Sequence, residues 1–135
     1  MCIRDRSRGI PIDALGMQMH ISGNNAPSKA EVVENMRRFG GLGLKIYITE
    51  FDVNMHDYPG NDEERDTKQA DIYSDMLGAC LEVGHEICPN FGFLGLVDRQ
   101  SWYNGIGLDD ADPLLFRSDY TPKPAFFAIR KTLEQ

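Results

Sequence analysis

Two carboxylates, Glu50 and Asp52, stand two residues apart after an apolar segment, and they are the residues of this chain best placed to do chemistry. The segment from Leu44 to Ile48 is short, rich in β-branched and aromatic residues and preceded by glycines, which is typical of a core strand in a parallel sheet. Barrel enzymes carry their reacting groups at the carboxyl ends of such strands. A glutamate there can also cap a loop or pair with a lysine, so the two residues alone leave a structural role open.

Two further segments show the same pattern, an apolar strand followed by polar side chains. One runs from Ile12 to His20, where we expect a strand with a polar end, and another expected strand covers residues 91–97. If the three strands are parallel, their carboxyl ends meet at one rim of the sheet. The sequence therefore predicts one site at that rim, built from Gln18, His20, Glu50, Asp52, Asp98 and Trp102.

Helical patterns separate the expected strands. A capping box at Ser28 and Glu31 opens a helix predicted over residues 29–39, and an acidic first turn opens another over residues 62–83. A third helix is predicted over residues 125–133, after two prolines. The apolar stripes of the last two helices should contain Ala70, Tyr73, Leu77, Cys80, Leu81, Phe126, Phe127, Ile129 and Leu133.

The alternation of strand and helix predicts an α/β fold with parallel strands. Three parallel strands alone leave edges and faces uncovered, and such sheets normally occur with helices on all sides or closed into a barrel. A (β/α)8 TIM barrel typically needs ~250 residues, whereas this chain has 135. We therefore expect a partial barrel, made of its last three βα units.

The composition fits one globular domain and excludes some partners. Hydrophobic residues make up 41% of the chain, which is enough for a core. A net charge of −7 argues against nucleic acid or an anionic membrane surface as a partner, whereas a neutral polysaccharide is compatible with it. No stretch approaches the ~20 apolar residues of a membrane span.

The N-terminus and the cysteines each leave two interpretations open. Residues 1–7 begin with a run that resembles a translated sequencing adapter, and a short disordered arm is the alternative, so we expect the fold to occupy residues 8–135. Cys80 and Cys88 lie at the end of a predicted helix and the start of a predicted strand. A disulfide across that turn and two buried free thiols are both compatible with the sequence, whereas the spacing matches no zinc pattern.

Several short motifs follow one another between Gly9 and Leu133. They are Gly9-Ile10-Pro11-Ile12-Asp13 with Gly16-x-Gln18-x-His20; Ile48-Thr49-Glu50-Phe51-Asp52-Val53; Gln69-Ala70-x-x-Tyr73 and Ala79-Cys80-Leu81; Gly95-x-x-Asp98-x-x-Ser101-Trp102; and Pro113-Leu114-Leu115-Phe116 with Tyr120-x-Pro122-Lys123-Pro124-Ala125. In this order the motifs resemble those of the glycoside hydrolase family 10 endo-β-1,4-xylanases. The resemblance implies that residues 8–135 are the C-terminal part of a TIM-barrel catalytic domain, with strands six to eight. It also implies a secreted, monomeric parent enzyme that hydrolyses xylan without a cofactor.

The resemblance assigns roles to the predicted site residues. Retaining glycosidases use two carboxyl groups ~5 to 5.5 Å apart, one as nucleophile and one as general acid/base. Glu50 resembles the nucleophile, with His20 hydrogen-bonded to it and Asp52 orienting His20. Gln18 and Trp102 resemble the residues that line the sugar subsite next to the cleaved bond, with no metal involved.

The chain also departs from the family. The general acid/base is a glutamate after an asparagine on an earlier strand, and no such segment exists here, so the chain alone should be unable to complete the reaction. Leu94 stands where the family usually has a tryptophan of the cleft floor. Cys80 and Cys88 resemble the positions of a disulfide present in some members, with wider spacing.

Two other functions remain open from the sequence. His20, Glu50, Asp52 and His56 are side chains that metal sites use, so a metal-dependent barrel hydrolase is one alternative. A non-catalytic glycan-binding or degenerate paralogue is the other, suggested by Leu94 and by the missing acid.

Overall fold

The computed structural model of this chain describes residue 4 and residues 7–135. The predicted arm or adapter remnant at residues 1–7 therefore lies outside the described residues, except for Arg4 and Ser7. In chain order the elements are β1 (Ala14–Met17), β2 (His20–Ser22), the 3-10 helix η1 (Gly23–Asn25), α2 (Lys29–Gly40), β3 (Lys45–Asn54), α3 (Asp62–Val83), β4 (Asn90–Phe93), the 3-10 helices η2 (Asp98–Gln100) and η3 (Trp102–Ile106), and α4 (Pro124–Leu133).

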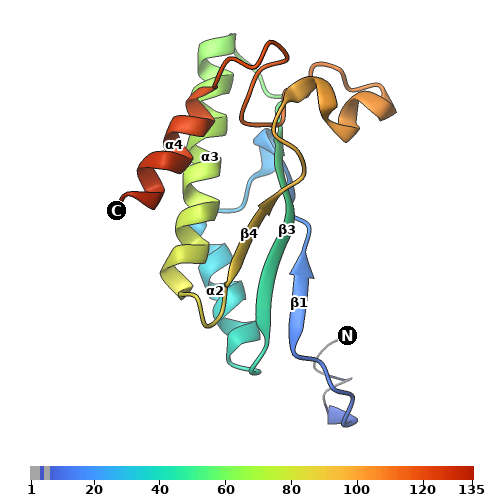
Figure 1. Cartoon of the computed structure of the whole chain (residues 1–135), viewed down its shortest axis with the longest axis vertical. Helices are drawn as coiled ribbons and strands as arrows, with labels where there is room; N and C mark the ends of the chain where they lie inside the picture. The colour runs from blue at the N-terminus through green and yellow to red at the C-terminus, as the bar shows by residue number, and fades with distance from the viewer. Residues whose placement is uncertain (1–3, 5–6) are drawn as a thin grey trace.

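The strands form one parallel sheet around β3. β1 and β2 pair with successive parts of β3, and β4 pairs with β3 as well, all in parallel. Since residues 47 and 48 of β3 pair with both β1 and β4, these two neighbours lie on opposite edges of β3. The helices α3 and α4 lie together along one side of this sheet (Figure 1). The prediction of an α/β fold with parallel strands is confirmed.

Local signals set the helix boundaries close to where the sequence predicts them. Ser28 and Glu31 form a capping box at the start of α2, and Asn61 and Glu64 form another at the start of α3. α4 begins with Pro124 in its first turn, where a missing backbone N–H is tolerated. None of the described helices is both long enough and apolar enough to cross a membrane.

The core lies between the sheet and the three helices. Phe51 of β3 packs edge to face on Tyr73 of α3, with ring centroids 4.9 Å apart. The predicted stripes are confirmed at Tyr73, Leu77, Cys80 and Ile129, which are buried, and wrong at Leu81, Phe127 and Leu133, which are 50%, 53% and 62% exposed. Ile72, Met76, Ala79 and Ala125 are buried as well.

The strands differ from their predicted lengths, and an irregularity in β3 accounts for part of this. Met17 lies opposite Ile48 but His20 lies opposite Asp52, so β3 uses one residue more than β1 and β2 over the same stretch. The pairing with β4 shifts over the same part of β3. The single strand predicted from Ile12 to His20 is wrong, because Met19 takes a left-handed backbone (φ 56°) between β1 and β2.

β3 and β4 are also mispredicted in extent. β3 continues through the two carboxylates to Asn54, whereas β4 ends at Phe93 and not at residue 97. Gly95, with φ 103°, turns the chain out of the sheet just beyond β4. Gly92 allows a close approach within β4, because a Cβ there would lie 3.1 Å from the Ile48 carbonyl oxygen, a tight contact.

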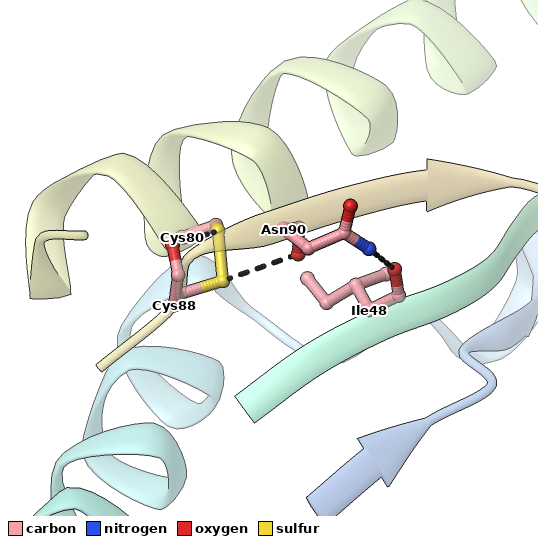
Figure 2. Close-up of a disulfide and its surroundings, with 4 residues drawn as sticks. All are labelled: Ile48, Cys80, Cys88 and Asn90. Atoms are coloured by element: carbon pink, nitrogen blue, oxygen red, sulfur yellow. Dashed lines mark hydrogen bonds between the residues drawn. A yellow bond between two sulfur atoms is a disulfide. The ribbon is translucent and has the colours of Figure 1, made fainter. Parts of the chain in front are cut away.

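Cys80 and Cys88 are bonded. The disulfide joins the last turn of α3 to the segment that enters β4, with Cα atoms 5.4 Å apart (Figure 2). Two residues further on, Asn90 Nδ2 donates a hydrogen bond of 2.8 Å to the Ile48 carbonyl oxygen, at the irregular part of β3. The structure thus selects the bonded pair over two free thiols.

Replacing both cysteines by alanine (C80A/C88A) should destabilise the protein by roughly 2.5 kcal/mol, the loop-closure value for so short a loop. The change is measured by comparing the urea midpoint of the wild type with that of the double variant, each in the complete protein that contains this chain. Dithiothreitol should lower the wild-type midpoint to that of the double variant and leave the variant unchanged. A double variant as stable as the oxidised wild type would contradict the prediction.

Candidate active site

The irregularity in β3 turns Glu50 and Asp52 away from the helices. Ile46, Ile48, Phe51 and Val53 all belong to the core cluster, so the alternation of the strand shifts by one residue between Ile48 and Phe51. Irregularities of this kind occur near active sites, where they re-aim a side chain. Glu50 and Asp52 consequently share the face of β3 opposite the core.

His20 joins the two carboxylates. It begins β2, directly opposite Asp52, and its Nδ1 lies 2.9 Å from Asp52 Oδ2. Its Nε2 lies 3.3 Å from Glu50 Oε2. Because an ionised carboxylate can only accept, the imidazole satisfies both partners when each ring nitrogen donates a proton. This arrangement fixes the orientation of Glu50 relative to the strand.

The two carboxylates differ in their access to solvent. The Glu50 side chain is 33% exposed, whereas that of Asp52 is 1% exposed. A substrate can therefore reach Glu50, while Asp52 is enclosed by its hydrogen-bond partners.

Asp52 receives donors from η3 as well as from His20. Trp102 Nε1 donates to Asp52 Oδ2 at 2.9 Å, and the Tyr103 hydroxyl donates to Asp52 Oδ1 at 3.4 Å. Burial raises the pKa of Asp52 above its usual value, and the hydrogen bonds from Trp102, His20 and Tyr103 oppose that effect. Burial also raises the pKa of Tyr103, so its hydroxyl stays protonated and donates.

Gln18 and Trp102 border the same cluster. Gln18 Nε2 lies 3.5 Å from Glu50 Oε1, at the outer limit of a hydrogen bond. The Trp102 side chain meets His20 edge to face at 5.2 Å and remains 41% exposed. An exposed indole face can carry an apolar or sugar surface. The structure thus brings together five of the predicted rim residues: Gln18, His20, Glu50, Asp52 and Trp102.

Asp98 is the exception, because its carboxylate binds residues outside this cluster. Its Oδ1 accepts a hydrogen bond from the Leu114 backbone N–H at 2.8 Å, and its Oδ2 lies 3.3 Å from Lys123 Nζ. Both side chains of this ion pair are buried. The prediction that Asp98 belongs to the same site is wrong, since β4 ends early and the chain turns before Asp98.

The four side chains considered as metal ligands are not arranged as a metal site among the described residues. His56 Nδ1 binds the carboxylate of Asp110, and its Nε2 lies 3.6 Å from Asp57 Oδ1. Across residue 4 and residues 7–135, no group of three or more His, Cys, Asp or Glu side chains has an arrangement that could hold a metal ion. The set His20, Glu50, Asp52 and His56 is therefore not supported as a metal site.

Sequence reasoning missed Tyr103 and Lys123 as parts of the surroundings of the site. Tyr103 reaches Asp52 across 51 residues of sequence, and Lys123 reaches Asp98 across 25. Neither contact follows from a local periodicity. The only sequence signal was that each residue lies in or next to a motif of the family resemblance.

Known proteins resemble this chain in both sequence and structure. The profile of glycosyl hydrolase family 10 matches residues 1–132. Endo-1,4-beta-xylanase B of Thermotoga neapolitana is 37% identical over 132 residues, which cover 96% of this chain and 36% of that protein. The thermostable celloxylanase of Thermoclostridium stercorarium is 35% identical over 130 residues, which cover 90% of this chain and 33% of that protein.

Two solved structures that resemble this chain are also xylanases. The crystal structure of xylanase 10B from Thermotoga maritima matches 98% of this chain and 40% of its own, with a TM-score of 0.85 and 34% identity. Xylanase 10C from Cellvibrio japonicus in complex with xylopentaose matches 98% of this chain and 29% of its own, with a TM-score of 0.84 and 30% identity. These structural neighbours are (β/α)8 barrels, of which this chain covers only a part.

The chain spans about a third of the length of the two curated relatives described. The match to the family profile nevertheless covers nearly all of the chain. The chain therefore belongs to glycosyl hydrolase family 10.

Proposed function

We propose that this chain forms strands six to eight, with their helices, of the (β/α)8 barrel of a retaining endo-1,4-β-xylanase. In this proposal Glu50 is the nucleophile, His20 and Asp52 position it, and Gln18 and Trp102 line the adjoining sugar subsite. The relatives are named as xylanases, and one related structure holds xylopentaose, which supports xylan as the substrate class.

One observation carries the proposal. Of the two carboxylates that flank His20, only that of Glu50 is open to a substrate, and its Oε2 lies 3.3 Å from His20 Nε2. A carboxylate that is oriented by an imidazole and open to solvent can attack an anomeric carbon. Attack forms a glycosyl ester on Glu50 and releases the leaving oxygen, and water then cleaves the ester.

The second carboxyl group would come from the part of the barrel outside this chain. The general acid/base of the resembling family is a glutamate that follows an asparagine, and this chain contains no Asn-Glu pair. We therefore infer that the general acid/base lies on an earlier strand, and that this chain alone does not hydrolyse xylan.

Exposed apolar side chains support the partial barrel. Tyr47, on the face of β3 opposite the core, is 38% exposed, and Leu96, just beyond β4, is 52% exposed. Phe127 and Leu133 are exposed on α4. The remaining units of a barrel would cover surfaces of this kind.

The remaining parts of the proposal concern location and partners. We infer that the complete enzyme is exported, because xylan is a large polymer and because disulfides such as Cys80–Cys88 persist in oxidising compartments. From the family resemblance alone we expect it to be a monomer. The two-carboxylate reaction needs neither a metal nor a cofactor. The net charge of −7 favours a neutral polysaccharide over nucleic acid or an anionic membrane.

Covalent trapping of the glycosyl-enzyme tests the proposal. The complete protein is incubated with a 2,4-dinitrophenyl 2-deoxy-2-fluoro-β-xylobioside, whose fluorine slows both steps while the good leaving group keeps the first step faster. We expect one 2-fluoroxylobiosyl group, attached to the proteolytic peptide that contains Glu50. Release of dinitrophenolate without a label, or a label on another carboxylate, would refute Glu50 as the nucleophile.

Hydrolysis of xylan by the unmodified protein must accompany this test. Binding of xylan without hydrolysis would favour the non-catalytic glycan-binding alternative.

A further inference from the structure

Lys123 forms a buried ion pair with Asp98, which begins η2 shortly before Trp102 and Tyr103 in the chain. The side chains of Lys123 and Asp98 are 1% and 5% exposed, and Nζ lies 3.3 Å from Oδ2. Burial lowers the pKa of Lys123 and raises that of Asp98, while the attraction between the two charges opposes both effects. A buried ion pair is a weak source of stability, because desolvation offsets most of the attraction. Because the pair contributes little to stability, a role for it is to be found in the contacts that it makes with the surrounding segments.

The pair joins the two ends of one loop. Asp98 begins η2, and its Oδ1 accepts a hydrogen bond from the Leu114 N–H at 2.8 Å. Lys123 Nζ also donates to the carbonyl oxygen of Asp112 at 2.6 Å. Residue 98 and residues 112–114 are the ends of the segment that carries η3. The Lys123 ammonium group thus closes this segment into a fixed loop.

Inside the loop, hydrogen bonds continue from Asp98 to Trp102 and Tyr103. The Asp98 carbonyl oxygen accepts from the Ser101 backbone N–H at 3.0 Å and from Asn104 Nδ2 at 3.1 Å. Ser101 Oγ in turn accepts from the Tyr103 backbone N–H at 3.2 Å. These contacts orient η3, from which the Trp102 and Tyr103 side chains donate to Asp52.

We infer that Lys123 is a positioning residue for the reaction at Glu50. Through the loop from Asp98 to Leu114 it holds Trp102 and Tyr103 against Asp52, which orients His20 and thereby Glu50. Lys123 itself touches neither the substrate nor Glu50. The inference rests on the proposed function and adds a residue to its machinery.

A double-mutant cycle between Lys123→Met and Trp102→Phe separates positioning from general stabilisation. In the complete protein, K123M should lower kcat/KM for an aryl β-xylobioside by about 10- to 100-fold, the size of effect expected from misplacing groups around the reacting atoms. The loss should lie mainly in kcat. In the W102F background, where the indole donor of Trp102 to Asp52 is already gone, K123M should lower kcat/KM by less than about threefold.

Matched variants distinguish a loss of positioning from a loss of folding. Lys131→Met removes an exposed lysine from α4, the helix that begins directly after Lys123, and should leave turnover unchanged. Rates are normalised to the folded fraction from circular dichroism. If K123M does not fold, the cycle is run with K123M/D98N, which leaves no unpaired buried charge.

A second readout needs no substrate. In protein labelled with 15N-tryptophan, the indole N–H of Trp102 is assigned from its absence in W102F. It should exchange slowly with solvent in the wild type and in K131M, and at least about tenfold faster in K123M or K123M/D98N, because its bond to Asp52 loosens.

The outcomes separate the two hypotheses. An additive cycle, or equal exchange of the Trp102 N–H in all variants, overturns the positioning role. A wild-type protein without xylan hydrolysis contradicts the proposed function instead, and the exchange measurement then decides the role of Lys123 by itself.

Discussion

Replacing Glu50 by glutamine is expected to lower kcat/KM for xylan by on the order of 10⁴- to 10⁶-fold, as loss of a nucleophile does in other covalent mechanisms. The amide has nearly the same shape but cannot form the glycosyl ester. Its NH2 group or oxygen can still face His20 and Gln18, so the fold should survive. The variant should therefore bind xylo-oligosaccharides and fail to cleave them, which isothermal titration and reducing-sugar release measure separately.

Two controls sharpen this experiment. Glu34→Gln changes an exposed glutamate on α2 and should keep full activity. Glu50→Ala with an activated aryl xylobioside and azide should yield a glycosyl azide of inverted configuration, because azide attacks the anomeric carbon from the side that Glu50 vacates and the aryloxide leaves. Residual activity of E50Q above about a hundredth of wild type would assign the nucleophile elsewhere.

The helices were the part of the fold most readable from the sequence, because their signals are local. The capping box at Ser28 and the acidic turn after Asn61 each lie within four residues of the helix start. The faces of α3 and α4 were less readable. Which side of a helix is buried depends on the sheet it packs against, and Leu81 and Phe127 face away from that sheet.

The sequence was sufficient to predict which residues form most of the candidate site, but not how the strands arrange them. The family motifs indicated Glu50, His20 and Asp52, and the structure places all three within one hydrogen-bonded cluster. The extra residue in β3 could not be predicted, because it is defined only by the register with the neighbouring strands. Asp98 was misassigned for a related reason, since its strand ends at Phe93 and the chain turns before it.

The irregularity in β3 decides on which face of the strand Glu50 and Asp52 lie. Without the shift, Glu50 and Asp52 would share the face of Ile46 and Ile48 and point into the helix-packed core. The Asn90 side chain bonds to the Ile48 carbonyl oxygen at this place, and the absence of a Cβ at Gly92 permits the close approach. The disulfide at Cys88 anchors the entry to β4 two residues before Asn90. Contacts from β4 thus lie at the irregularity that turns Glu50 toward the face opposite the core.

Asp52→Asn should lower kcat/KM by on the order of 10²- to 10⁴-fold, comparable with the loss when asparagine replaces an aspartate that orients a catalytic histidine. The groups around Asp52 are all donors, namely His20, Trp102 and Tyr103. A carboxylate accepts from all of them, whereas an amide must turn its own NH2 toward at least one. His20 then loses the charge that fixes its orientation, so Glu50 is no longer aimed. Asp75→Asn, an exposed change on α3, should keep full activity.

The same variant should also change how stability depends on pH. Because burial raises the pKa of Asp52, the folded protein retains a proton that the unfolded chain releases between the usual pKa of an aspartate and the raised value. The contribution of Asp52 to stability therefore falls as pH rises through that window. The amide of the D52N variant carries no such proton, so the free energy of unfolding of the wild type minus that of D52N should decrease as the pH rises above the usual pKa of an aspartate, about 4. Urea titrations of both proteins and of D75N at several pH values measure this difference. A difference that stays constant or grows with pH would mean that the partners of Asp52 outweigh the effect of its burial.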